Sequence, residues 1–116
     1  MKYLVILNDP PYGTERGYNG LRLAGALAKA EDTLVSVFLI GDAVGCALTG
    51  QNTPTGYYNI ERMLKPLTAK GGKTGVCGTC MDARGIKPES LVDGAKRSSM
   101  DELTAWTQEA DKVIVF

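Results

Sequence analysis

Leu34-Val35-Ser36-Val37-Phe38-Leu39-Ile40 is apolar at every position except Ser36. A run this short and this apolar is typical of a strand buried on both faces, as in a parallel sheet covered by helices. Residues 2–8 have the same character, and Asp9-Pro10-Pro11 follows them, where two prolines must take the chain out of a central strand. Residues 73–77 and 111–116 are the next two candidate strands, so four strands are spread along the chain.

Helical patterns separate these strands. Residues 19–30 have apolar side chains at helical spacing, and residues 43–48 form a shorter helix. Residues 58–70 continue the pattern, but Pro66 should kink that helix or end it early. The later helical segments are one or two turns over 78–84, closed by Gly85, and a helix that Ser99 caps, with Glu102 completing a capping box.

The region between these last two helices is less regular. Residues 88–92 form a short helical or extended piece, and the extended alternative supplies a fifth strand. Strands then alternate with helices along the whole chain. We therefore expect one α/β domain over residues 1–116, an open and mostly parallel five-stranded sheet with helices on both faces.

Composition narrows the classes of function. The chain has 116 residues, enough for one domain, and its 13 Lys and Arg balance 13 Asp and Glu. This neutral charge, with no run of basic residues, indicates neither a nucleic-acid nor a membrane partner. No segment approaches the roughly 20 apolar residues of a membrane span, and the N-terminus lacks a signal peptide, so we expect a cytoplasmic protein. The chain has no histidine, which excludes histidine-based catalysis.

The sharpest chemical feature is Cys77-Gly78-Thr79-Cys80, a C-x-x-C motif where a strand ends and a helical turn begins. Unpaired backbone N–H groups and the positive end of a helix dipole stabilise a thiolate there and lower its pKa below the free value of about 8.5. Ligand crevices of open parallel sheets also form at the carboxyl ends of strands. Cys77 is therefore the candidate reactive residue, with Cys80 as a second candidate.

Other interpretations of the cysteines remain open. Small buried residues near a strand end often serve packing alone, and Cys46, among apolar neighbours, is expected in the core. A thioredoxin-like site would need its cysteine pair after the first strand, whereas this pair follows the third. A structural zinc site needs four ligands, and three cysteines without histidine do not supply them, so we expect no metal unless subunits share one.

Four residues outside the motif are candidates for binding substrate. Asp9 and Tyr12 lie in the loop after the first strand, on the same side of the sheet as Cys77, although two prolines also make this loop a rigid turn. Tyr58 follows the polar stretch 49–56, a candidate mobile loop, and either lines a pocket or packs as a core or interface aromatic. Arg84 either pairs with an anion or is a solvated helix residue.

Five segments carry a family resemblance, and in order and spacing they span nearly the whole chain. Asn8-Asp9-Pro10-Pro11-Tyr12-Gly13 with Leu21-Arg22-Leu23-Ala24 and Val37–Val44 resembles the opening of DsrE/DsrF-like proteins. Residues 76–86 are similar to their cysteine segment, and residues 109–116 to their C-terminal strand. The resemblance implies a YchN-like α/β fold, homo-oligomers such as trimers or hexamers, and cytoplasmic sulfur relay without a cofactor.

In the sulfur-carrying members of that family, a cysteine at the position of Cys77 takes sulfur as a persulfide and passes it to a partner protein. The resemblance thus implies a sulfur-relay role for Cys77, with sulfur donor and acceptor proteins as partners. Cys80 matches the branch with C-x-x-C and can resolve the persulfide by forming a disulfide. The alternative is a non-catalytic oligomeric module of the same fold that binds a small ligand or partner at the loops 9–12 and 49–58.

Overall fold

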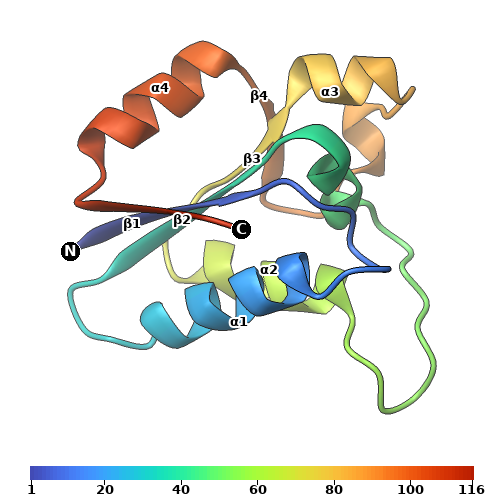
Figure 1. Cartoon of the computed structure of the whole chain (residues 1–116), viewed down its shortest axis with the longest axis horizontal. Helices are drawn as coiled ribbons and strands as arrows, with labels where there is room; N and C mark the ends of the chain where they lie inside the picture. Colours follow the sequence, from blue (N-terminus) through green and yellow to red (C-terminus); the bar gives the residue numbers. More distant parts are fainter.

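Five strands form a single parallel sheet in the computed structural model, which describes residues 1–116 (Figure 1). Their order across the sheet is β4-β3-β2-β1-β5, and every neighbouring pair is parallel. The strands are β1 (Lys2–Leu7), β2 (Leu34–Leu39), β3 (Thr74–Cys77), β4 (Ala95–Ser98) and β5 (Lys112–Val115). The α/β fold with a five-stranded sheet is therefore confirmed, and the sheet is parallel throughout.

Helices cover both faces of this sheet. Two of them, α1 and α2, lie on one face, and α3 and α4 lie on the other (Figure 1). The α-helices are α1 (Arg16–Leu27), α2 (Ile60–Ala69), α3 (Gly78–Ala83) and α4 (Met100–Glu109), and the 3-10 helices are η1 (Gly41–Ala47) and η2 (Pro88–Ser90). No helix combines the length and the apolar character that crossing a membrane requires.

The core lies around the two central strands. Val5 and Leu7 of β1 and Val37 and Leu39 of β2 are fully buried, as their continuous apolar runs predict. Leu64 of α2 is also buried and belongs to the same hydrophobic cluster. At one edge of the sheet, β5 is mostly exposed although its sequence is equally apolar. Only its position at the edge of the sheet distinguishes β5 from the central strands.

At two places the structure excludes one of the alternatives that the sequence left open. The fifth strand is β4 at residues 95–98, and the segment 88–92 where we expected it begins with the 3-10 turn η2. The polar residues of β4 hid it, because an edge strand need not be apolar. Pro66 does not end its helix, and α2 continues to Ala69. Leu64 and Leu67, on either side of the proline, are both buried, and their packing outweighs the lost backbone hydrogen bond.

Ser99 caps α4 as predicted, because its hydroxyl accepts the backbone N–H of Glu102 at 3.2 Å. The second hydrogen bond of a capping box, from the Ser99 backbone N–H to the Glu102 carboxylate, is not formed. The Glu102 carboxylate accepts the hydroxyl of Ser98 instead of the backbone N–H of Ser99. The start of α4 is thereby tied to the carboxyl end of β4, beside the segment that follows β3.

Candidate functional site

Cys77 lies at the carboxyl end of β3 and is 8% exposed. Side chains alternate between the two faces of a strand, and a side chain at Gly75 would touch Phe38 and Trp106 of α4. Cys77, two residues later, therefore faces the same side of the sheet as α4. It lines a cavity of about 270 Å3 whose other walls are Phe38, residues 78–79 and residues 97–100.

The surroundings of Cys77 lower the pKa of its thiol. Burial alone raises this pKa, but hydrogen bonds from the side chains of Cys80 and Thr79 and from their backbone N–H groups outweigh burial. The Cys77 Sγ lies 3.4 Å from the Thr79 Oγ1. The expected thiolate-stabilising turn is therefore present, and its hydrogen bonds favour Cys77 as the first of the two thiols to ionise.

The pKa of the Cys80 thiol is shifted in the opposite direction. Burial and the hydrogen bond with Cys77 raise the pKa of Cys80, while the backbone N–H of Gly41 and the charge of Arg84 oppose this rise. The Gly41 N–H donates to the Cys80 Sγ at 3.2 Å. Because Gly41 begins η1, directly after β2, this contact connects the carboxyl ends of two neighbouring strands. The C-x-x-C motif thus combines one thiol whose pKa is lowered with one whose pKa is raised.

Arg84 does not line the cavity beside Cys77. Its guanidinium donates to the Asp42 carboxylate at 2.7 Å and to the Cys80 carbonyl at 3.0 Å. It therefore connects the end of α3 with η1. The position of Arg84 makes it a support for the turn that holds Cys80, in parallel with the Gly41 contact.

The positive charge that does line the cavity belongs to Arg97 of β4, which our sequence analysis missed. Its guanidinium forms two hydrogen bonds with the Asp82 carboxylate, of 2.8 and 2.9 Å. This pair lowers the pKa of Asp82 and raises that of Arg97. No local motif marks Arg97, because β4 reaches Cys77 only through the pairing of Cys77 with Ser98 in the sheet.

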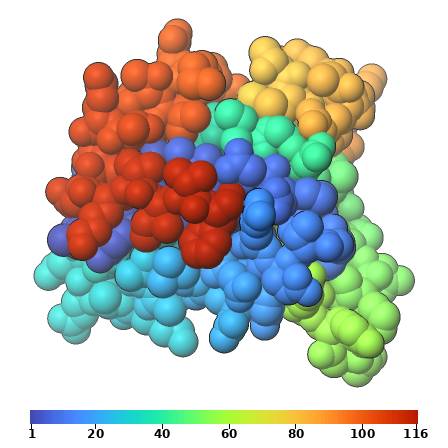
Figure 2. Space-filling model, viewed as in Figure 1, coloured from blue at the N-terminus to red at the C-terminus, as the bar shows by residue number.

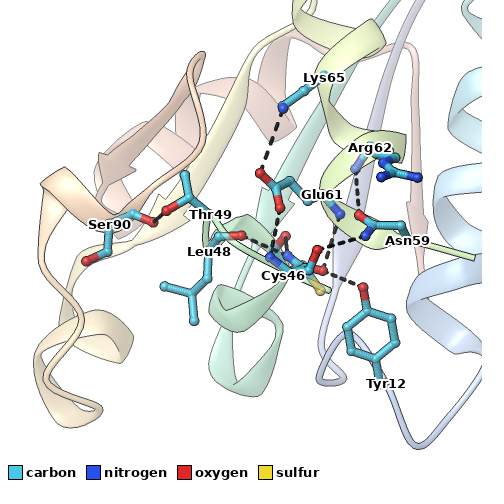
Figure 3. Close-up of polar contacts among 10 residues, drawn as sticks. Tyr12, Cys46, Leu48, Thr49, Asn59, Glu61, Arg62, Lys65 and Ser90 are labelled. Carbon is cyan, nitrogen blue, oxygen red and sulfur yellow. Dashed lines mark hydrogen bonds and ion pairs between the residues drawn. The ribbon is translucent and has the colours of Figure 1, made fainter. Parts of the chain in front are cut away.

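Asp9 and Tyr12 lie outside this cavity. Asp9 accepts the hydroxyl of Thr14 at 3.1 Å and lies 3.6 Å from the Arg16 guanidinium. Tyr12 donates to the Gln51 side-chain oxygen at 2.6 Å and accepts the backbone N–H of Ile60 at 3.1 Å. Figure 3 shows Tyr12 among the polar contacts before α2. Both residues hold the loops 9–14 and 49–59 in place.

Tyr58 lies with these loops rather than near Cys77. Its ring stacks on Tyr12 and Tyr18 at centroid distances of 5.6 and 4.3 Å. Burial, with the charge of Glu15, raises the pKa of Tyr58. The stretch 49–56, a candidate mobile loop in the sequence, is anchored by the Gln51 amide, which donates to the carbonyls of Cys46 and Leu48, each at 2.9 Å.

Cys46 is fully buried beneath this loop. Burial raises the pKa of its thiol to about 12, so it remains a protonated core residue, as the sequence predicts. No group of three or more Cys, Asp or Glu side chains is arranged to hold a metal ion. Of the three cysteines, Cys77 is therefore the one whose pKa is lowered.

Comparison with known proteins gives matches over the whole chain. The model of the DsrE/DsrF-like family matches residues 1–116. Protein YchN of Escherichia coli (strain K12) is 44% identical over 116 residues, covering 99% of this chain and 98% of YchN. The crystal structure of that E. coli protein has a TM-score of 0.90 at 43% identity and 100% coverage of both chains. Sulfurtransferase TusD of Salmonella typhi is 26% identical over 128 residues, covering 100% of each chain.

Proposed function

The chain belongs to the DsrE/DsrF-like family, as its sequence predicts, and from that premise we propose that it is a cytoplasmic sulfur-relay protein that carries sulfane sulfur as a persulfide on Cys77. The relative TusD is a sulfurtransferase, which supports sulfur as the cargo. A reducing compartment fits this role, because it keeps the two cysteines as free thiols.

The observation that carries this proposal is the environment of Cys77. Its thiol lies at a cavity, at the carboxyl end of a central strand, and hydrogen bonds from Cys80 and Thr79 lower its pKa. The thiolate is the nucleophilic form of cysteine, so these contacts increase the reactive fraction near neutral pH. None of the four cavities is lined by Asp9, Tyr12 or Tyr58, so ligand binding at those loops has less support.

The transfer needs no cofactor or oxidant. The Cys77 thiolate attacks the outer sulfur of a donor persulfide, the S–S bond of the donor breaks, and the donor leaves as a thiolate. Cys77 then carries the sulfur as Cys77–S–SH. An acceptor thiolate that attacks this outer sulfur takes it and releases the Cys77 thiolate, so the protein returns to its starting state.

Cys80 adds a second way to release the sulfur. Its thiolate attacks the inner sulfur of the Cys77 persulfide, which forms a Cys77–Cys80 disulfide and expels hydrosulfide. An external dithiol must then reduce this disulfide before another cycle. The mutual influence of the two thiols on their pKa values supports this step, because it requires the two side chains to lie close together.

Intact-protein mass spectrometry tests the proposal directly. Wild type incubated with a persulfide of a small thiol should gain one sulfur atom. Cys77→Ser should not, and Cys80→Ser should retain the added sulfur longer because the internal release is lost. Alkylation with iodoacetamide under the same conditions serves as a check of thiol reactivity. A Cys80→Ser protein that gains no sulfur while Cys77 alkylates readily would contradict the carrier role.

We further propose that the protein acts as a homo-oligomer, with sulfur donor and acceptor proteins as its other partners. The support is β5, an edge strand whose Val113 and Val115 are 40% and 61% exposed. Figure 2 shows the C-terminal residues on the surface, with no other element over them. Exposed apolar edge strands are commonly covered by another chain, and the neutral net charge opposes association little.

A further inference from the structure

A fixed positive charge lies beside the proposed nucleophile. The Arg97 guanidinium is held by the Asp82 carboxylate through two hydrogen bonds of 2.8 and 2.9 Å, one to each oxygen. Two parallel contacts fix the plane of the guanidinium as well as its position. Five N–H groups are available on a guanidinium, so those that Asp82 does not bind remain free for a ligand. Arg97 lines the same cavity as Cys77.

Gly78 makes room for this arrangement. A Cβ atom at Gly78 would lie 2.8 Å from the Arg97 Cζ and 2.9 Å from its Nε, closer than real Cβ atoms approach. The guanidinium therefore covers the backbone directly after Cys77. Besides the contact with Asp82, the negative charge of Cys77 contributes to the raised pKa of Arg97, so the two groups lie within electrostatic range.

The rest of the cavity suits a small ligand. Its volume is about 270 Å3, just below the 300–1,000 Å3 that is typical of pockets for small molecules. Phe38 and Met100 form apolar walls, and Ser99 adds a hydroxyl whose proton is not engaged by the capping contact. A nucleophilic sulfur and a cation with free N–H donors therefore line one small cavity.

We propose that this cavity selects small sulfur donors that carry a negative charge, and that Arg97 is the residue that binds this charge. The inference rests on the proposed role of Cys77 in carrying sulfur. It assigns a substrate class, small anionic sulfane-sulfur compounds, of which thiosulfate is the simplest. It also assigns a positioning role to Asp82, which orients Arg97, and explains why a residue without a side chain follows Cys77.

The reaction with thiosulfate balances without another reagent. The Cys77 thiolate attacks the sulfane sulfur, a new S–S bond forms on Cys77, and the S–S bond of thiosulfate breaks. Sulfite leaves with the electron pair of that bond, and Cys77 retains a persulfide anion. Negative charge grows on the sulfite oxygens as the bond breaks, where a preorganised guanidinium is most effective.

Two thiol reagents of opposite charge test whether the cavity prefers anions, independently of sulfur transfer. Sulfonatoethyl methanethiosulfonate is anionic and trimethylammonioethyl methanethiosulfonate is cationic, and both modify a thiolate by the same reaction. All variants carry Cys80→Ser so that one reactive thiol remains at the site. Both second-order rate constants are proportional to the thiolate fraction of Cys77, so their ratio does not depend on that fraction. With Arg97 present, the anionic reagent should react faster.

Arg97→Gln should reduce this ratio by about five- to tenfold, the effect of one charge pair near a protein surface. Arg97→Lys should keep part of the preference for the anionic reagent, because lysine keeps the positive charge but lacks the paired N–H donors of the guanidinium. Gly78→Ala should also reduce the ratio, because it displaces the guanidinium while Arg97 remains. Lys96→Gln is the matched control, since it removes the same charge from the neighbouring residue of β4, outside the cavity, and should change the ratio little.

Two outcomes separate the claims. If Arg97→Gln leaves the rate ratio unchanged, or lowers it no more than Lys96→Gln does, the anion-selection inference is overturned even if Cys77 carries sulfur. If the ratio depends on Arg97 but wild type gains no sulfur from thiosulfate or a small-thiol persulfide, the carrier role fails and the anion-selective cavity stands. A sulfur gain from thiosulfate that Arg97→Gln slows, by mass spectrometry, supports both.

Discussion

The backbone N–H of Gly41 donates to the Cys80 Sγ at 3.2 Å, which joins the turn after β2 to the turn after β3. The Arg84–Asp42 ion pair, with an N–O distance of 2.7 Å, spans the same two segments. Cys80 is thus a structural contact of η1 as well as a potential resolving thiol. We expect a reaction that moves the Cys80 sulfur toward Cys77 to weaken the Gly41 hydrogen bond.

Hydrogen exchange at Gly41 should report this coupling. Cys80→Ala removes the acceptor, so the Gly41 amide should exchange about fivefold faster, corresponding to roughly 1 kcal/mol for one hydrogen bond. Oxidation of Cys77 and Cys80 to a disulfide in wild type should have a similar effect. Two-dimensional NMR measures both. The Ile40 amide, which donates to the Leu7 carbonyl at 3.1 Å, is the internal control and should not change.

The pH dependence of alkylation should distinguish Cys77 from Cys80. The pKa of Cys77 is lowered and that of Cys80 is raised, so the alkylation rate of Cys77 should reach half its maximum at a lower pH than that of a free thiol. Cys80→Ala and Thr79→Val each remove a hydrogen bond to the thiolate and should move this midpoint upward. Peptide mapping after iodoacetamide treatment measures it. A midpoint at or above the free value in wild type would contradict the assignment.

Cys46 should be inert in the folded protein. Its pKa of about 12 and complete burial leave almost no accessible thiolate at pH 8. We expect labelling of Cys77 and Cys80 in native protein, and of all three cysteines in guanidinium chloride. Mass spectrometry counts the labels. Labelling of Cys46 at the same rate as Cys77 in buffer would contradict its assignment to the core.

Gly72 should not tolerate a side chain. A Cβ atom there would lie 2.0 Å from the Val35 carbonyl oxygen, a backbone atom that cannot move without disturbing β2. We expect Gly72→Ala to lower the free energy of unfolding by roughly 3 kcal/mol or more. Gly25→Ala is the control, because no atom lies within 4 Å of its Cβ and the residue is helical. It should raise the free energy of unfolding by about 0.5–1 kcal/mol. Urea denaturation followed by circular dichroism measures both.

The exposed edge of the sheet should mediate self-association. Val115 on β5 is 61% exposed, and Val115→Lys places a charge where an apolar contact between chains is expected. Size-exclusion chromatography with light scattering should show a smaller assembly for the variant, with an unchanged circular dichroism spectrum. The substitution Lys87→Gln, at a polar exposed turn away from β5, is the control. Equal masses for wild type and Val115→Lys would remove β5 from the proposed interface.

Much of the fold follows from local patterns that need no tertiary information. The apolar runs at 2–8 and 34–40 predict the central strands, because only a strand covered on both faces is apolar at nearly every position. The placement of β4 could not be predicted in the same way. Its residues Lys96, Arg97 and Ser98 form an edge strand that is polar on much of its surface, and such a segment resembles a loop in sequence.

For the candidate site, too, the features that depend on local sequence could be predicted and the others could not. The position of Cys77 at the end of β3, and the burial of Cys46, depend on residues next to them in the chain, and both predictions agree with the structure. Asp9, Tyr12, Tyr58 and Arg84 do not line the cavity where Cys77 lies. Being near the same edge of a sheet does not determine which face a side chain occupies, and Tyr58 stacks on Tyr12 and on Tyr18 of α1 instead.

The sequence by itself therefore determined the α/β class and the cysteine at the strand end, because these depend on short-range periodicity and on the C-x-x-C spacing. It also identified the family, through the resemblance of several segments in their order along the chain. Only the tertiary structure decided which charge faces that cysteine. Arg97 reaches Cys77 because β4 pairs with β3 in register, Cys77 opposite Ser98, and because Gly78 leaves space for the guanidinium. Register between strands depends on the packing of the whole sheet, so the 19 residues between Cys77 and Arg97 carry no local signal of this contact.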